Sequence, residues 1–321
     1  MRWVHYKLPA REAAAGPAWV HYGIPRTGSS SVRFLLRRAW NAAHLPWQHL
    51  ETVLAEGARG ADRVIMEAPD RRVLDFAGDG ARFFTTLRDP LRACRSLYYW
   101  ARGAEGLDTT LAEFAAALPR SYNPFARYLA ALAGGGAPSA PDNPMFWRDG
   151  DGFFADLPDD ELLAMAEQVL AARFPLVGLL ERFDETAFLL ARSLGWRTLP
   201  LHQRINFSVK DRQALDGPDP AAQARMEEAT AVDRVLYDRV AARFEDRAAA
   251  LAGDRAAVDE YAAACARIAG QVLQQKNLLM VGGDVFPGAA GGQAGGLDMA
   301  VVAPLARAGR LLEVEDYLPV T

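Results

Sequence analysis

The chain has 321 residues, half of them hydrophobic and about a quarter charged, which is typical of a globular protein large enough for one α/β domain with an appendage. Its net charge of −4 leaves no surplus of cations for general nucleic-acid binding, so any anion site must be local. The two cysteines, Cys94 and Cys265, argue against a disulfide framework or a four-ligand zinc site. We expect a cytoplasmic protein, because the N-terminus lacks the apolar core of a signal peptide and no run is long and apolar enough for a transmembrane segment.

Short apolar runs that end in polar residues alternate with longer helical patterns, which is typical of a parallel sheet wrapped by helices. In chain order, the expected strands cover residues 18–24, 62–67, 82–87 and 175–180. The expected helices cover residues 29–43, 90–102, 109–118, 159–173, 184–194, 219–250 and 255–275. Pro90 suits a first helical turn, and Asp108 and Asp184 are candidate helix caps. The pattern predicts an α/β protein with a parallel sheet flanked by helices.

Two stretches rich in glycine and small residues, at 133–144 and 282–296, break this alternation. The first is typical of a surface loop and the second of a linker before a short apolar tail. We therefore expect a main domain in residues 1–250 and a helical C-terminal extension in residues 251–321. The tail at residues 297–321 could pack on the domain, reach a partner subunit, or be disordered, and the extension could join the subunits of a homo-oligomer.

A glycine-bounded turn, HYGIPRTGSSS at residues 21–31, follows the first expected strand. Gly23 and Gly28 have the spacing of the phosphate-binding loop G-x-x-x-x-G-K-[ST], but serine replaces the lysine and the cation, Arg26, lies inside the loop. The hydroxyl donors of the turn are Thr27, Ser29, Ser30 and Ser31. Because the turn leads into a helix, its N–H groups would converge on an anion. Glycine and serine also make plain turns and caps, so the turn alone leaves both interpretations open.

A second strand runs into a cation in FFTTLRDPLRACRSLYYW, residues 83–100. Arg88 stands at the strand's C-terminal end, where open α/β sheets bind ligands, and Ser96 follows eight residues later. An Arg88–Asp89 pair that caps the next helix is the structural alternative. We favour Arg88 and Ser96 as a second anion contact.

The two segments together resemble the nucleotide-binding motifs of the PAPS-dependent sulfotransferases. IPRTGSSS resembles their 5′-phosphosulfate loop, P-[KR]-[ST]-G-[ST]-[ST], and LRDPLRACRSLYYW is similar to their 3′-phosphate motif. NPFARYLA, VGLLERFDET, INFSVKDR and VDRVLYDRVAARFEDR follow in family order and resemble the uronyl and heparan-type branch. The resemblance covers about residues 18 to 250. It implies a P-loop-NTPase-like sulfotransferase fold and an O-sulfotransferase that moves a sulfuryl group from PAPS (3′-phosphoadenosine 5′-phosphosulfate) to a hydroxyl, with product PAP and no metal.

The resemblance also implies roles for individual residues. Arg26 stands where lysine is more usual and would stabilise charge on the leaving phosphate, while Arg88 and Ser96 would hold the 3′-phosphate. The residues implied for the cradle around the 5′ side are Thr27, Gly28, Ser29, Ser30 and Ser31. Lys210 is either part of a loop that closes over the nucleotide or a plain surface lysine.

Sulfuryl transfer to an alcohol needs a base for the hydroxyl proton, and relatives place one in or just after the strand that follows the first helix. Glu67 ends the run DRVIME at this position, where desolvation would raise its pKa into a useful range. Its alternative is an ion pair with a nearby arginine such as Arg71. His44 and His49, which flank LPWQ after the first helix, are the reserve bases.

Several alternatives remain open at this point. Glu181, Arg182 and Asp184 fit an ordinary charge cluster at a strand end. A P-loop kinase or NTPase would share the fold but would want a lysine at position 29 and a carboxylate for Mg²⁺. A non-catalytic nucleotide-binding scaffold is the third possibility. The acceptor is a sugar, a lipid headgroup or a small-molecule alcohol.

Overall fold

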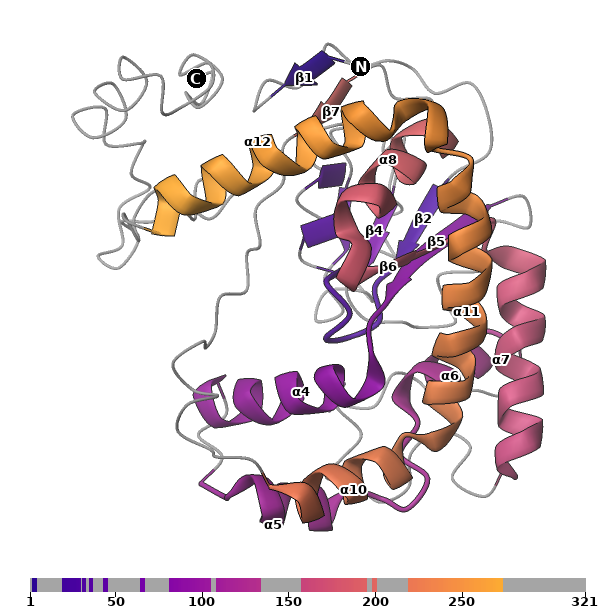
Figure 1. The fold of residues 1–321 in the computed structure, drawn as a ribbon. Coiled ribbons are helices and arrows are strands. Elements are labelled where there is room, and N and C mark those ends of the chain that lie inside the picture. The colour runs from indigo at the N-terminus through magenta and orange to yellow at the C-terminus, as the bar shows by residue number, and fades with distance from the viewer. Residues whose placement is uncertain are drawn as a thin grey trace.

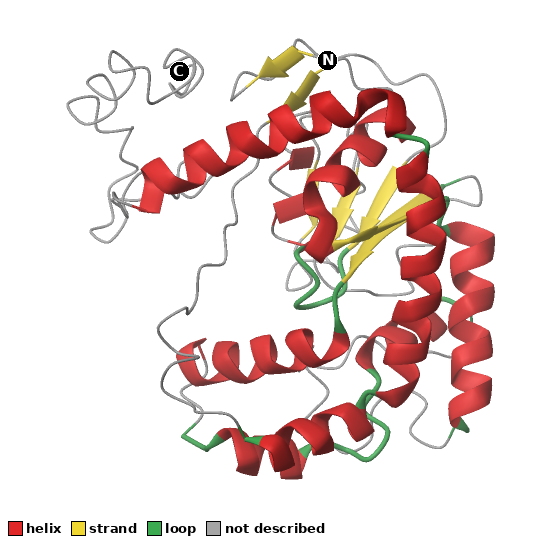
Figure 2. Cartoon of the chain, viewed as in Figure 1, coloured by secondary structure: helices red, strands yellow, loops and turns green. Residues whose placement is uncertain are grey.

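A computed structural model describes residues 2–4, 19–29, 31–32, 35–36, 43–45, 64–66, 81–104, 108–133, 157–194, 198–200 and 219–273. Within these ranges the protein is α/β, with helices packed around a central parallel sheet (Figures 1 and 2). The class predicted from the sequence is confirmed at this level.

The central sheet has five parallel strands in the order β3-β4-β2-β5-β6. In chain order they are β2 (Trp19–Tyr22), β3 (Ala43–Leu45), β4 (Val64–Met66), β5 (Arg82–Leu87) and β6 (Leu176–Leu179). A separate parallel pair joins β1 (Arg2–Val4) to β7 (Thr198–Pro200). All four residues of β2 are buried, as are the last five of β5, because helices cover the sheet.

The helices surround the sheet in Figure 1, with α7 and α11 side by side along one flank and α4, α5 and α10 grouped below. The α-helices are α4 (Pro90–Ala104), α5 (Leu111–Ala117), α6 (Pro124–Ala130), α7 (Asp159–Arg173), α8 (Phe183–Ser193), α10 (Pro220–Ala229), α11 (Ala231–Ala249) and α12 (Arg255–Leu273). Two 3₁₀ turns, η2 (Leu180–Arg182) and η3 (Ala252–Asp254), precede α8 and α12. Most of the expected helices are confirmed within a few residues.

The helix expected over residues 219–250 is in fact two helices that meet at Thr230. The carbonyl of Ala229 accepts hydrogen bonds from the N–H groups of Tyr122 and Asn123, at 2.9 and 3.1 Å. The side chain of Asn123 in turn accepts from the N–H groups of Val232 and Asp233. A loop more than 100 residues away therefore interrupts the helix, and no local sequence signal encodes the break.

Asn123 and Asp233 cap each other's helices. While Asn123 Oδ1 caps the start of α11, the Asp233 carboxylate accepts the N–H groups of Phe125 and Ala126 at the start of α6, at 2.9 and 2.8 Å. Both side chains are almost completely buried. This reciprocal cap satisfies four backbone donors that a helix start leaves open, and it fixes α6 against α11.

Three details of the sequence prediction are wrong. Residues 43–45 form strand β3, which was not expected, and the first of them was predicted to end the helix at 29–43; this short run pairs with β4. The cap of α5 is Thr110, whose hydroxyl forms a capping box with Glu113, and not Asp108. Helix α8 begins at Phe183 directly after η2, so Asp184 lies inside its first turn.

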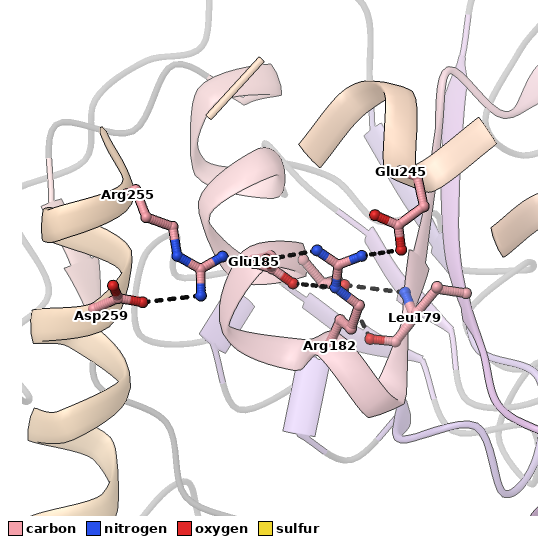
Figure 3. A network of polar contacts seen from close by, with 7 residues as sticks. Leu179, Arg182, Glu185, Glu245, Arg255 and Asp259 are labelled. Carbon is pink, nitrogen blue, oxygen red and sulfur yellow. Dashed lines mark hydrogen bonds and ion pairs between the residues drawn. The ribbon is translucent and has the colours of Figure 1, made fainter. Parts of the chain in front are cut away.

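The C-terminal helix α12 packs against α8, and Figure 3 shows the polar contacts at this junction. Arg255 binds Glu185 at 2.9 Å, and Arg182 binds both Glu185 and Glu245 of α11. Beneath them the ring of Tyr261 meets Phe188 edge-on, with centroids 5.4 Å apart. The start of α12 therefore shares the core of the sheet domain. The predicted boundary at residue 250 stays a prediction, and residues 274–321 lie outside the described ranges.

Candidate anion-binding site

Three neighbouring strands of the sheet deliver polar segments to one edge. Because β2, β5 and β6 are parallel and adjacent, their C-terminal ends lie side by side. Strand β2 leads into the turn at residues 23–28, β5 leads into Arg88 and Asp89, and β6 leads into η2. The C-terminal edge of such a sheet is where α/β proteins bind ligands.

The turn after β2 has an unusual backbone. Arg26 has φ +66° and Gly28 has φ +94°, both in the region that side chains with a Cβ rarely adopt. The hydroxyls of Thr27 and Ser29 both donate to the carbonyl of Ile24, at 2.7 and 2.9 Å. These two hydroxyls hold the turn together, and each uses its one hydrogen in this bond. The geometry therefore does not favour the expectation that they donate to an anion. A helix starts at Ser29, and the N–H groups of Ser31 and Val32 in its first turn donate to the carbonyl of Gly28, at 2.9 and 3.2 Å.

Neighbouring segments hold this turn in place. The hydroxyl of Thr86, in β5, donates to the carbonyl of Thr27 at 2.9 Å, and both residues are buried. A Cβ on Gly28 would lie 2.5 Å from Cδ1 of Leu180 in η2. The turn is therefore fitted between β5 and η2, and it presents Arg26 in a fixed backbone conformation.

The two expected anion contacts meet in the structure. The Arg26 guanidinium donates to the hydroxyl of Ser96, on α4, from Nε at 3.2 Å and from Nη2 at 2.8 Å. Arg88 Nη1 points to the carbonyl of Arg26 at 3.4 Å, which is a long contact. One cluster at the sheet edge is thus formed by Arg26, Arg88 and Ser96. The first and last of these residues are 70 positions apart in the chain.

Positive charge in this cluster is poorly compensated. Burial and the nearby charge of Arg88 lower the pKa of Arg26 to about 10. Burial also lowers the pKa of Arg88, although Glu181 opposes this effect. Among the described residues, no carboxylate forms an ion pair with Arg26. Two half-buried guanidinia that repel each other, one of them in a strained backbone, would both be stabilised by a bound anion.

A small cavity adjoins Arg26 on the side of α4 and α6. Its volume of about 20 Å³ accommodates one water molecule. The wall is largely apolar and includes Pro25, Leu97, Tyr122 and Tyr128. This space is too small for an acceptor molecule.

Other candidate residues are not brought into the cluster. Ser30, His49, Glu67 and Lys210 lie outside the described residues. Strand β4 ends at Met66, one residue before Glu67. His44 lies in the middle of β3, paired in register with Ile65, and its role as a reserve base stays a prediction. The N–H of Ser31 bonds to the carbonyl of Gly28 at 2.9 Å, inside the helix start.

Two acidic residues lie near the cluster: Glu181, which was not predicted to serve it, and Asp89, which the alternative prediction gave as a cap of the next helix. Glu181 in η2 accepts the N–H of Asp89 through Oε1 and the hydroxyl of Tyr237 through Oε2, both at 3.0 Å. Asp89 itself caps α4, because Oδ1 accepts the N–H of Arg92 at 2.8 Å. The only sequence signal for Glu181 was its position at a strand end.

The chain matches no protein-family model, and no curated protein matches it. Among the described residues, no three histidine, cysteine or acidic side chains gather in a way that could hold a metal ion. No helix within the described ranges is both long and apolar enough to cross a membrane.

Proposed function

We propose that the protein is an O-sulfotransferase that binds PAPS at the cluster of Arg26, Arg88 and Ser96 and transfers its sulfuryl group to an acceptor hydroxyl. The observation that carries the proposal is the meeting of Arg26 with Ser96, which joins the two motifs that resemble the 5′ and 3′ elements of that family. The order of the parallel strands, with both motifs at C-terminal strand ends, is compatible with the P-loop-NTPase-like fold that the resemblance implies.

The chemistry of the cluster fits a nucleotide that carries two separate anionic groups. Arg26 and Arg88 are half-buried cations on different strand ends, and the first has no carboxylate partner among the described residues. A guanidinium suits phosphate oxygens because it offers several donors in one plane. Arg88 and Ser96 would hold a terminal phosphate, and Arg26 would face the phosphate that leaves.

The bound nucleotide supplies the activated sulfuryl group. Arg26 keeps its proton near neutral pH, even with its pKa lowered to about 10, so it acts through its charge and not as an acid. It therefore stabilises negative charge that builds on the departing phosphate. Proton removal from the acceptor needs a second group, for which Glu67 is our candidate and His44 and His49 are the reserves.

The first experiment is thermal unfolding with ligands. Adenosine 3′,5′-bisphosphate without Mg²⁺ should stabilise the protein by about 2.7 kcal/mol at a hundred times its dissociation constant, a rise of several degrees in Tm. Arg88→Ala should remove most of this shift. Arg82→Ala, at the opposite end of the same strand, is the matched control and should retain it. A preference for Mg-ATP would favour a kinase or NTPase instead.

The second experiment measures turnover with isotope-labelled PAPS and acceptors from a metabolite extract, with mass spectrometry to find the sulfated product. Glu67→Gln should reduce turnover by about 10²–10⁴-fold while the nucleotide still binds. If Glu67→Gln and the two histidine variants all keep wild-type turnover, the assignment of the base is wrong. If the nucleotide binds and no acceptor is ever sulfated, a non-catalytic scaffold becomes the better description.

A further inference from the structure

Glu181 connects the segment that follows β5 to helix α11. Its Oε1 accepts the N–H of Asp89, the residue that follows Arg88, and its Oε2 accepts the hydroxyl of Tyr237 on α11. Its neighbour Leu180 approaches Gly28 in the turn that carries Arg26. The short turn η2 therefore contacts both segments that carry the arginines, and it is hydrogen-bonded to α11 through Tyr237.

The charge of Glu181 acts on Arg88 as well. This carboxylate is the largest charge that opposes the effect of burial on the pKa of Arg88. Asp89 adds a weaker attraction, whereas Arg92 and the guanidinium of Arg26 repel Arg88. Although Glu181 is exposed, both of its oxygens have partners, which fixes the carboxylate in one orientation.

We propose that Glu181 is a positioning residue for the anion site: it holds the Arg88–Asp89 segment through the Asp89 N–H, and Tyr237 orients its carboxylate. A fixed backbone at Asp89 keeps Arg88 directed toward the turn at Arg26, where a phosphate would bridge the two segments. The identity of that anion as a nucleotide phosphate rests on the function proposed above, whereas the positioning itself does not.

Two substitutions separate position from charge. Glu181→Gln keeps an oxygen for the Asp89 N–H and removes the negative charge near the ligand, whereas Glu181→Ala removes both. A positioning role predicts opposite effects, because loss of the charge alone favours an incoming anion and loss of the anchor releases Arg88. A residue that only tunes charge would give tighter binding in both variants, and a surface residue without a role would change neither.

Glu245→Ala is the matched control. Glu245 also joins η2 to α11, through Arg182 (Figure 3), and Arg182 is its only hydrogen-bond or ion-pair partner among the described residues. It tests whether loosening η2 from α11 is enough to weaken the site. Tyr237→Phe removes the hydroxyl that orients Glu181 and should give a smaller loss in the same direction as Glu181→Ala.

The test is isothermal titration of the full-length protein with adenosine 3′,5′-bisphosphate and, separately, with inorganic pyrophosphate. We expect about tenfold weaker binding in Glu181→Ala, wild-type or tighter binding in Glu181→Gln, and no change in Glu245→Ala. Equal shifts in the two Glu181 variants, or an equal loss in Glu245→Ala, would overturn the positioning role.

Pyrophosphate keeps this test apart from the proposed function. If the wild-type protein binds pyrophosphate and not the nucleotide, the sulfotransferase proposal fails while the pyrophosphate series still decides the role of Glu181. If the nucleotide binds and the variants behave as the wild type does, the function stands and the positioning role fails. Binding of neither probe overturns both.

Discussion

Gly28→Ala is predicted to lower the stability of the protein for two separate reasons. Gly28 has φ +94°, where a side chain strains the backbone by about 1–2 kcal/mol. The new Cβ would also lie 2.5 Å from Leu180 Cδ1, more than 1 Å inside a normal carbon contact, and such overpacking costs about 1–3 kcal/mol. The two effects together should lower the free energy of unfolding by about 2–5 kcal/mol.

The assay is equilibrium unfolding in urea, with Gly253→Ala as the matched control. Gly253 has an ordinary φ, and a Cβ there would meet nothing within 4 Å, so this variant should be neutral or slightly stabilised. The double variant Gly28→Ala with Leu180→Ala should recover the contact part of the loss, about 1–3 kcal/mol of coupling. It should not recover the backbone strain.

Two outcomes would refute this reasoning. If Gly28→Ala unfolds at the same urea concentration as Gly253→Ala, the turn does not have the backbone conformation described. If Gly28→Ala is destabilised but shows no coupling to Leu180→Ala, strain accounts for the whole loss and η2 does not press on the turn. The second result would also weaken the picture of η2 as a support for the anion site.

Three further predictions concern the rest of the domain. Burial raises the pKa of Asp233 to about 7, although the hydrogen bonds that it accepts from two backbone N–H groups and the charge of Arg127 lower it. The folded state therefore binds a proton at this carboxylate more tightly than the unfolded chain does. The stability from this group is therefore present at acid pH and is lost as the pH rises through 7. Between pH 5 and 8 the free energy of unfolding of the wild type, measured in urea, should fall by about 2–3 kcal/mol relative to that of Asp233→Asn. Equal changes with pH in the two proteins would contradict this prediction. Asn123→Ala should lower the free energy of unfolding by about 1–2 kcal/mol, more than Thr110→Ala at the exposed cap of α5, and the reverse order would count against the reciprocal cap. Arg255→Ala should leave the midpoint nearly unchanged in high salt, since this exposed side chain contributes through screened charges, and a large loss at every salt concentration would contradict this view.

Much of the fold can be predicted from local pattern alone. The runs that became β2 and β5 are short and rich in β-branched or aromatic residues, and the run that became β6 is short and apolar. Pro90 marks the start of α4 as expected. Because parallel strands place their C-terminal ends at one edge, the positions of Arg26 and Arg88 within the sequence already indicated a shared site.

Elements that depend on distant partners escaped this reasoning. The three residues of β3 have no strong pattern of their own, and they form a strand because β4 offers them hydrogen bonds. The break at Thr230 exists because the loop at Asn123 captures the end of α10 and the start of α11. Helical periodicity is the same on both sides of the break, so the sequence predicts one continuous helix there.

The candidate site divides in the same way. Residue types and spacing alone determined that Arg26, Arg88 and Ser96 are candidate anion contacts. Both arginines follow apolar strands, and the C-terminal ends of such strands are where α/β sheets bind ligands. Only the tertiary structure decided that Arg26 lies on Ser96, that the hydroxyls of Thr27 and Ser29 turn inward, and that Glu181 supports the segment of Arg88. Side-chain direction and pairing across strands depend on which segments become neighbours, and that is settled by packing between residues far apart in the chain.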